Sequence, residues 1–307
     1  MVLVTLLWSM AGVVTRQVEQ AQGLTLTFWR SAFNSLALLV LLAWVRSPRG
    51  LFSALRRGRW LLWASGGCWA VMFTAFMWAL TMTTVANVLV TMALGPLITA
   101  VLARWFLRER LTGHTFLAVV LAGTGLAVMQ WPALRAAGAV TPDANGPMLM
   151  MGQSPAHAAG LLLALAVPVA GAVNWVLIRA AVARESEDRS AAEAPDFLLS
   201  VLIGAVLSTL LASLGAEPAE VSRADLGWLA LLGVFQLAVP CLLAVQVARV
   251  LEPAEVALLS LLEVIFGVAW AWMGTAEQPQ AAVVLGGTAV ILTLVLHEGW
   301  NWRQRRP

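Results

Sequence analysis

The sequence predicts an all-α integral membrane protein with ten transmembrane helices, built as two inverted repeats of five helices. Three observations predict this fold class. Hydrophobic residues make up 60% of the 307 and charged residues only 11%, whereas soluble domains carry about 25% charged residues. Long stretches lack Asp, Glu and Arg, and the longest, residues 60–103, has room for two spans of about 20 residues each. Finally, short motifs of the first half recur in the second half.

The apolar segments lack the polar stripe that a soluble core helix shows at every turn. In chain order, we expect spans at residues 2–19, 25–45, 60–81, 84–105, 113–131, 156–183, 196–214, 226–248, 254–274 and 280–298. The first span begins almost at Met1, so we expect no cleavable signal peptide before it.

The linker between the fifth and sixth spans divides the chain nearly in half. It contains Pro132, Pro142 and Pro147 together with Gly146, residues that interrupt helices. We therefore expect four parts in the chain. They are a first five-helix repeat at 1–132, a periplasmic linker at 133–153, a second five-helix repeat at 154–300 and a cytoplasmic tail at 301–307.

Arginine is distributed unequally between the two sides of the predicted bundle. The linkers after spans two, four, six and eight, with the C-terminal tail, hold 15 of the 19 basic residues, whereas the other side holds Arg16, Arg135 and Arg223. Such an excess marks the cytoplasmic side. We expect both termini in the cytoplasm, and a multi-pass protein of the bacterial inner membrane. Because topology accounts for the positive charge, no nucleic-acid partner is expected.

Two pairs of matching motifs carry the internal repeat. Residues 119–124 (VVLAGT) in span five resemble residues 283–288 (VVLGGT) in span ten, and residues 94–98 (LGPLI) in span four align with residues 262–266 (LEVIF) in span nine. Copies that are offset by five spans cross the bilayer in opposite directions, because five is odd. Inverted repeats of this kind predict a central site near the middle of the bilayer.

Four short motifs occur in the order and spacing of a known family. Leu7-Trp8-Ser9 resembles a Trp-Gly start, residues 24–30 (LTLTFWR) resemble a span-two opening with Arg, residues 108–111 (RERL) resemble a Gly-Glu-Arg-Leu signature, and residues 261–263 (LLE) resemble Leu-Glu-Pro. Together they resemble the drug/metabolite transporter (DMT) superfamily, specifically its EamA-type ten-helix transporters. The chain departs from that pattern where Ser9 replaces Gly, Val264 replaces Pro, and residues 277–279 lack a basic residue.

The resemblance implies the EamA fold and a secondary transporter that exports amino acids or similar small metabolites. We expect alternating access around a central cavity, with a small-molecule substrate and the lipid bilayer as partners and protons as a candidate coupling ion. The protein is expected to be a monomer or a homodimer. A multidrug or amphipathic-cation exporter on the same fold is the alternative, which an aromatic or acidic cavity would favour.

The sequence lacks the residue patterns of an enzyme. It has no nucleotide-binding Gly loop with Lys, no Ser/His/Asp set and no facing pair of carboxylates. The three His residues do not have the spacing of metal ligands. We expect no enzymatic activity, no cofactor and no metal. A membrane-embedded enzyme or an accessory protein without transport activity remains the alternative from another class.

Four residues are candidates for coupling or gating, because charges in hydrocarbon need a partner or a purpose. Glu263, in span nine, is either a proton-titrating or amine-binding carboxylate or a structural acceptor. Arg30, early in span two, is expected to anchor the helix, with a grip on a substrate carboxylate as the alternative. Glu109 is expected in a structural or gating pair at the cytoplasmic interface, and Pro96 in a kink or hinge.

Polar and aromatic groups within the spans are candidates for contact with substrate, and interhelical hydrogen bonding is the alternative for the polar ones. Asn87 and Thr91 lie four residues apart and share a helix face. The full predicted substrate-binding set is Trp8, Trp78, Asn87, Thr91, Asn174, Trp175, Gln246 and Glu263. This set requires Asn87, Asn174, Gln246 and Glu263 to converge on one cavity.

Overall fold

The regular structure is entirely helical throughout the described part of the chain. The computed structural model describes residues 1–15, 17–21, 23–57, 60–82, 88, 91–92, 94–108, 112–138, 155–187, 196–218, 221–274 and 281–304. Within these residues the chain forms α-helices and one stretch of π-helix.

The first half contains seven described helices. They are α1 (Val2–Ser9), α2 (Ala11–Thr15), α3 (Gly23–Arg46), α4 (Pro48–Arg57), α5 (Trp60–Met82), α7 (Gly95–Phe106) and α8 (Gly113–Gly138). The second half contains α9 (Pro155–Glu187), α10 (Phe197–Ser213), α11 (Arg223–Leu231), the π-helix η2 (Leu232–Ala238), α12 (Val239–Ala248), α13 (Pro253–Ser260), α14 (Leu262–Gly274) and α15 (Ala281–Gln304).

Described helix occurs within every predicted span, but three spans are broken and several helices are longer than expected. The first span is interrupted at Met10, the fourth at Leu94 and the ninth at Leu261. Helix α8 continues through Pro132 to Gly138, so the first residues of the predicted 133–153 linker are helical, and residues 139–154 lie outside the described residues. Helix α15 likewise continues to Gln304, within the predicted tail. Pro132 does not end α8, in keeping with the tolerance of proline in membrane helices, where neighbouring groups can satisfy the freed carbonyl.

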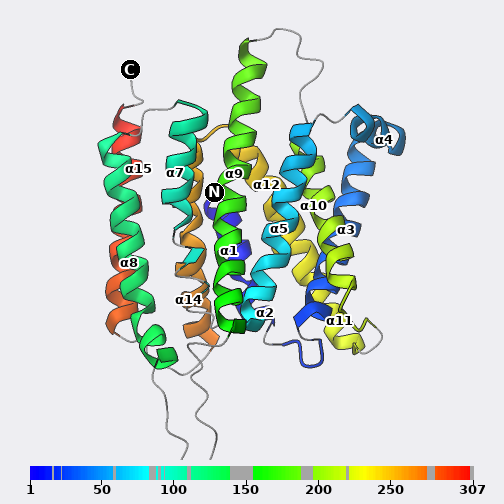
Figure 1. The fold of residues 1–307 in the computed structure, drawn as a ribbon, viewed down its shortest axis with the longest axis horizontal. Coiled ribbons are helices and arrows are strands. Elements are labelled where there is room, and N and C mark those ends of the chain that lie inside the picture. Colours follow the sequence, from blue (N-terminus) through cyan, green and yellow to red (C-terminus); the bar gives the residue numbers. More distant parts are fainter. Residues whose placement is uncertain are drawn as a thin grey trace, which may run out of the picture.

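Helix α4 lies where the sequence analysis placed a linker. It follows Ser47, whose backbone has a φ of 62°, and it carries Arg49, Arg56 and Arg57. In Figure 1 it lies at one end of the bundle, at the same end as the C-terminal end of α15. An amphipathic helix with this composition suits the polar boundary of a membrane.

The longest apolar helices have the dimensions of membrane spans. Four described helices are long and apolar enough to cross a membrane, at Gly23–Val45, Trp60–Ala79, Ala159–Ala183 and Arg223–Ala248. Shorter apolar helices include Val2–Thr15, Gly95–Phe106 and Phe197–Ser213. Large apolar side chains such as Leu36, Val40 and Trp44 are exposed on the outside of the bundle. Such a surface is unfavourable in water and suits a lipid environment.

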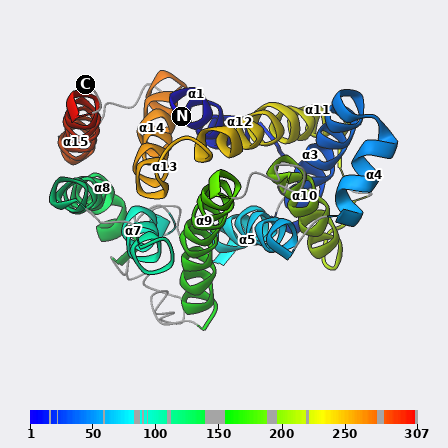
Figure 2. The ribbon, with the colours of Figure 1, turned by 90° about the horizontal axis from the view of Figure 1, so that it is seen from above.

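The helices run roughly side by side and interleave the two halves of the chain (Figures 1 and 2). Helix α5 packs between α9 and α10, α3 packs against α10 and η2, and α1 packs against α14. Helices α8 and α15 pack mainly on each other at one edge. The largest apolar core lies between α3, α5, α9, α10 and α12, and a smaller one joins α8, α13, α14 and α15.

Glycine permits the closest helix contacts in the bundle. A Cβ at Gly66 of α5 would lie 2.6 Å from Ile203 Cγ2 of α10, and a Cβ at Gly204 of α10 would collide with Trp69 Cβ. The two helices therefore meet backbone to backbone, as small residues allow in membrane interiors. This contact fixes the position of Trp69, which lines the cavity described next.

Candidate substrate cavity

A cavity of about 180 Å³ lies between the two halves of the chain. It is lined by residues from α1, α2, α3, α5 and α7 of the first half and from α9, η2, α12, α13 and α14 of the second half. By the volume that one water occupies, it has room for on the order of a dozen waters. This is the size of a small metabolite.

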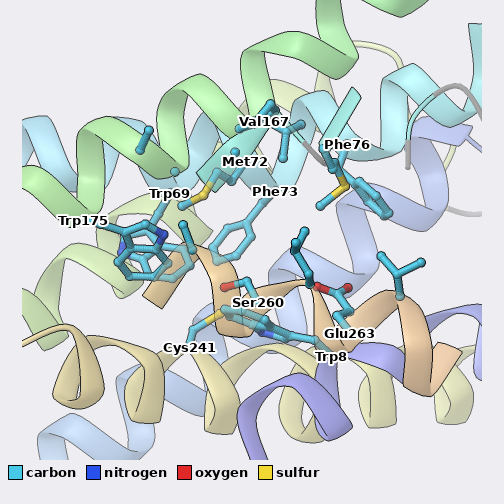
Figure 3. A pocket seen from close by; sticks show the side chains of 18 of the residues that line it. Trp8, Trp69, Met72, Phe73, Phe76, Val167, Trp175, Cys241, Ser260 and Glu263 are labelled. Carbon is cyan, nitrogen blue, oxygen red and sulfur yellow. The ribbon is translucent and has the colours of Figure 1, made fainter. Parts of the chain in front are cut away.

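Five aromatic side chains form what we call the aromatic wall: Trp8, Trp69, Phe73, Phe76 and Trp175. The rings of Trp69 and Phe73 lie 5.5 Å apart, and Trp69 meets Trp175 edge to face at 5.7 Å. Figure 3 shows these rings around the cavity, with Trp8 beside Cys241. Aromatic pairs in this geometry attract each other beyond the effect of buried area alone, so the wall is a firm apolar surface.

Two opposite charges also line the cavity. Arg30, on α3, is 4% exposed; its Nη2 donates to the carbonyl oxygen of Phe73 at 3.5 Å, and its Nε has no partner. Glu263 lies in the first turn of α14 and points toward the cavity in Figure 3. The two side chains attract each other. No ion pair within 4.0 Å joins these two described residues.

Breaks in the helices give the cavity its shape. The chain interrupts helix at Leu261, and Glu263 follows at the start of α14, where the helix dipole favours a negative charge. On the facing side, Pro96 lies in the first turn of α7. The preceding Gly95 packs beside α9, where a Cβ at this position would lie at the ordinary contact distance of 3.6 Å from Pro168 Cβ.

Hydrogen bonds from the second half hold Trp8 in place. Gln236 Nε2, in η2, donates to the Trp8 carbonyl oxygen at 3.2 Å, and Trp270 Nε1 donates to Ser9 Oγ at 3.0 Å. Pro240 follows four residues after Gln236 and cannot donate to its carbonyl. The wider turn of the π-helix accommodates the missing backbone hydrogen bond, and π-helical turns are frequent at functional sites.

Five of the residues singled out from sequence line the cavity. They are Trp8, Arg30, Pro96, Trp175 and Glu263. Their roles in binding, coupling or gating stay predictions.

The other described members of the predicted set do not line the cavity. Trp78 and Thr91 are absent from its lining, and the exposed Gln246 lies on α12 away from it. Asn174 is fully buried, where its Oδ1 accepts from Ser65 Oγ. The prediction that these polar residues meet in one cavity is therefore not met for Asn174 and Gln246. The hydrogen bond between α9 and α5 explains why the polar Asn174 is buried. Asn87 and Glu109 lie outside the described residues.

Sequence reasoning left most of the aromatic wall out of the predicted site. Trp69, Phe73 and Phe76 follow each other at intervals of four and three residues on α5, so they share one helix face. That spacing could have identified them as a set. Among the residues that the structure describes, no group of three or more His, Cys, Asp or Glu gathers in a way that could hold a metal ion.

Comparison with known proteins gives a family match over the first part of the chain and a shared fold over nearly all of it. A model of the EamA-like transporter family matches residues 1–131. No curated protein matches the chain. Chains of solved structures do match, and one described only as the crystal structure of a protein aligns with a TM-score of 0.74 at 16% identity. The alignment covers 97% of this chain and 95% of that one, so the two share a fold.

Proposed function

Because a model of the EamA-like transporter family matches residues 1–131, we propose that the chain is a secondary transporter exporting amino acids or similar small metabolites. Transport of small molecules across a membrane is the activity of the family. The proposal adds to this activity the direction of transport, which is export, and the substrate class. It also includes an inner-membrane location with both termini in the cytoplasm.

The pairing of helices supports two equivalent halves, at 1–132 and 154–300. If the halves are copies offset by five spans, α1 corresponds to α9, α3 to α10, α5 to the continuous helix of α11, η2 and α12, and α7 to α13 and α14. The contact of α5 with α9 then matches that of α12 with α1. The contacts of α7 with α9 and of α5 with α10 match those of α14 with α1 and of η2 with α3.

One observation carries the proposal: an arginine from the first half and a glutamate from the second half line the same cavity. Transporters with inverted repeats place substrate at the interface of the repeats and expose it alternately to each side. Arg30 and Glu263 both line the cavity between the two halves of the chain, which supports a site of this kind. Movement of one half against the other would change the distance between the two charges.

The aromatic wall favours a second candidate, export of amphipathic cations. Ring faces attract cations, and Glu263 supplies a negative charge in the same cavity. Arg30 opposes this candidate, because its guanidinium would repel a cation held nearby.

The test is flux in proteoliposomes that contain the purified protein. Amino acids and organic cations would be screened for flux, each with and without a pH gradient. We expect amino-acid flux that responds to the proton gradient in the wild type and not in Glu263→Gln, with the exposed Glu217→Gln as the matched control. Flux of cations alone would establish the second candidate, and no protein-dependent flux of any solute would overturn both.

A further inference from the structure

We propose that helix α4 binds anionic phospholipid, with lipid phosphate groups at Arg49 and Arg56 and the ring of Phe52 inserted among the acyl chains. No described residue of α4 lines the candidate substrate cavity. The proposed lipid site is therefore on the outer surface of the bundle, and it is independent of the substrate that the cavity takes.

The segment that joins α3 to α5 is strongly basic. Residues 46–59 contain five arginines and no acidic residue. An excess of arginine between two spans is explained by topology alone. Topology requires neither a helix in the linker nor an aromatic ring among the arginines, and α4 has both. The arrangement of side chains on α4 therefore indicates a more specific role than orientation of the chain.

Helix α4 has an inner face and an outer face. Leu51 and Leu55 of the inner face pack against the largest apolar core. Arg49, Phe52 and Arg56 are separated by three and then four residues, so they follow one another along one side of the helix. All three are exposed. Because the inner face is held by packing, the outer face presents an aromatic ring between two guanidinium groups.

Such a face suits lipid better than water. Phe52 is 62% exposed, and removal of a large apolar side chain from water is favourable. At the boundary of a bilayer the ring can enter the acyl region, while the long arginine side chains extend to the headgroups. A guanidinium holds a phosphate through two parallel hydrogen bonds. Phospholipids with net negative charge are favoured, because basic clusters on amphipathic helices attract anionic headgroups.

Neighbouring side chains indicate that α4 lies at the level of the headgroups. Trp44, near the end of α3, is 84% exposed, and Trp60, at the start of α5, is 63% exposed. Exposed tryptophans of membrane proteins gather at the interface between lipid and water. Figure 1 shows α4 nearly end-on, and Figure 2 shows its length at the edge of the bundle, so it lies across the long helices. Interfacial helices have this orientation.

The turn before α4 fixes this change of direction. Ser47 has a φ of 62°, a backbone conformation that is uncommon for residues other than glycine. Its Oγ accepts the backbone N–H of Gly50 at 3.3 Å. Pro48 occupies the first position of the helix, where proline is favoured because its φ is already helical. The outer face of α4 is thus held in one orientation before any lipid binds.

Native mass spectrometry of the purified full-length protein tests lipid binding directly. The protein would be released from detergent that contains equal amounts of dioleoylphosphatidylglycerol and dioleoylphosphatidylcholine, which have the same acyl chains and differ in headgroup charge. We expect phosphatidylglycerol to be retained at least about tenfold in preference, since each basic residue near an anionic surface strengthens binding severalfold. Equal retention of the two lipids would overturn the proposal.

Two double variants locate the site. Arg49→Gln with Arg56→Gln is expected to abolish most of the preference for phosphatidylglycerol. Arg104→Gln with Arg108→Gln is the matched control, because it removes the same charge from two exposed positions at the end of α7, and it should keep the wild-type preference. An equal loss in both double variants would show that the lipid responds to total charge and would overturn the assignment to α4.

A third variant tests the insertion of the ring. Phe52→Ser is expected to weaken retention of both lipids by a similar factor and to leave the preference for phosphatidylglycerol unchanged, because it removes apolar contact and no charge. Retention equal to that of the wild type would show that the ring does not contact acyl chains.

The same spectra identify other occupants of α4. sn-Glycerol 3-phosphate carries the phosphate without acyl chains, and at millimolar concentration it should not displace phosphatidylglycerol. Displacement would assign a soluble phosphate ligand to α4. A dimer that is lost in the α4 double variant, without lipid preference, would assign a second copy of the chain. Either result would overturn the proposed lipid site and leave the transport proposal standing, because flux in proteoliposomes tests transport separately.

Discussion

The carboxylate of Asp225 accepts the backbone N–H of Gln20 at 2.8 Å, across 205 positions of the chain. The same carboxylate accepts the N–H groups of Glu19 and Ala21 at 3.2 Å each. Asp225 lies at the start of α11 and is 2% exposed. One buried side chain therefore satisfies three backbone donors of the loop that precedes α3, and it joins the first half of the chain to the second.

Removal of this carboxylate should loosen that junction. Asp225→Ala would leave three backbone donors without their acceptor, and hydrogen bonds to a charged group each contribute about 1.5–3 kcal/mol. We expect a loss of about 3 kcal/mol, measured as a lower melting temperature in detergent. Asp225→Asn should fall between Ala and wild type. The exposed Glu217→Gln serves as control, and an Ala variant as stable as this control would contradict the prediction.

The contact of η2 with α3 should not tolerate a side chain at Gly233. A Cβ there would lie 2.6 Å from Phe33 Cβ and 2.7 Å from the carbonyl oxygen of Arg30. Gly233→Ala should therefore cost about 1–3 kcal/mol and also shift Arg30. In α11, Gly227 has no atom within 4 Å of the position a Cβ would take. Gly227→Ala should be neutral or stabilising; thermal melts that rank the two variants equally would refute the expected clash.

The contact between α5 and α10 provides a second matched pair of glycine substitutions. Gly204→Ala would drive a methyl group into Trp69 Cβ, whereas Gly67, on the adjacent α5, has open space around it. We expect Gly204→Ala to lower both the melting temperature and the amino-acid flux in proteoliposomes, because Trp69 belongs to the aromatic wall. Gly67→Ala should leave both unchanged. Normal flux in Gly204→Ala would show that the aromatic wall does not depend on this contact.

A buried hydroxyl joins three helices. Ser208 Oγ of α10 lies 3.0 Å from Ser31 Oγ of α3 and accepts from Thr74 Oγ1 of α5 at 2.9 Å. Interhelical hydrogen bonds in membranes contribute about 0.6 kcal/mol each, so Ser208→Ala should cost about 1 kcal/mol. A double-mutant cycle with Thr74→Val would isolate one bond. The exposed Ser213, which bonds only within its own helix, provides the control; a cost equal to that of Ser213→Ala would exclude the interaction.

The proposed orientation makes a topological prediction. Single cysteines at Ser47 and Glu217, in a background with Cys68 and Cys241 replaced, should react with an impermeant maleimide from opposite sides of the membrane. Ser47 lies between α3 and the Arg-rich α4, so it should be cytoplasmic. Residue 217 should be labelled in intact cells. Labelling of both positions from one side would reject the inverted arrangement.

The positions of the helices could be predicted well from sequence, because the energetic cost of charge in lipid sets them. Runs without Asp, Glu or Arg predict spans, and described helix occurs within each of them. The breaks at Met10 and Leu261 were not predictable in the same way. Neither position carries Pro or Gly, so no helix-breaking residue marks either break in the sequence.

Which face of each helix lines the cavity was harder to predict. A soluble helix reveals its inner face through an apolar stripe, but a helix in lipid is apolar all round. Gln246 was therefore expected in the cavity and is exposed on α12, whereas Trp69, Phe73 and Phe76 face the cavity from α5. Arg30 and Glu263 could be identified, because a charged residue within a membrane span is rare and nearly always faces the interior of the bundle or a polar cavity.

The π-helical stretch η2 also sets the rotational phase of the helix that contains it. Each residue of an α-helix advances by about 100°, so the extra residue in a π-turn offsets everything that follows it by that angle. Gly233, near the start of η2, meets α3, and Cys241, beyond the end of η2, lines the cavity. Deletion of one residue between them would restore a regular helix and turn Cys241 and its neighbours away from the cavity, although hydropathy would barely change. Chain length within 232–238 is therefore as constrained as residue type.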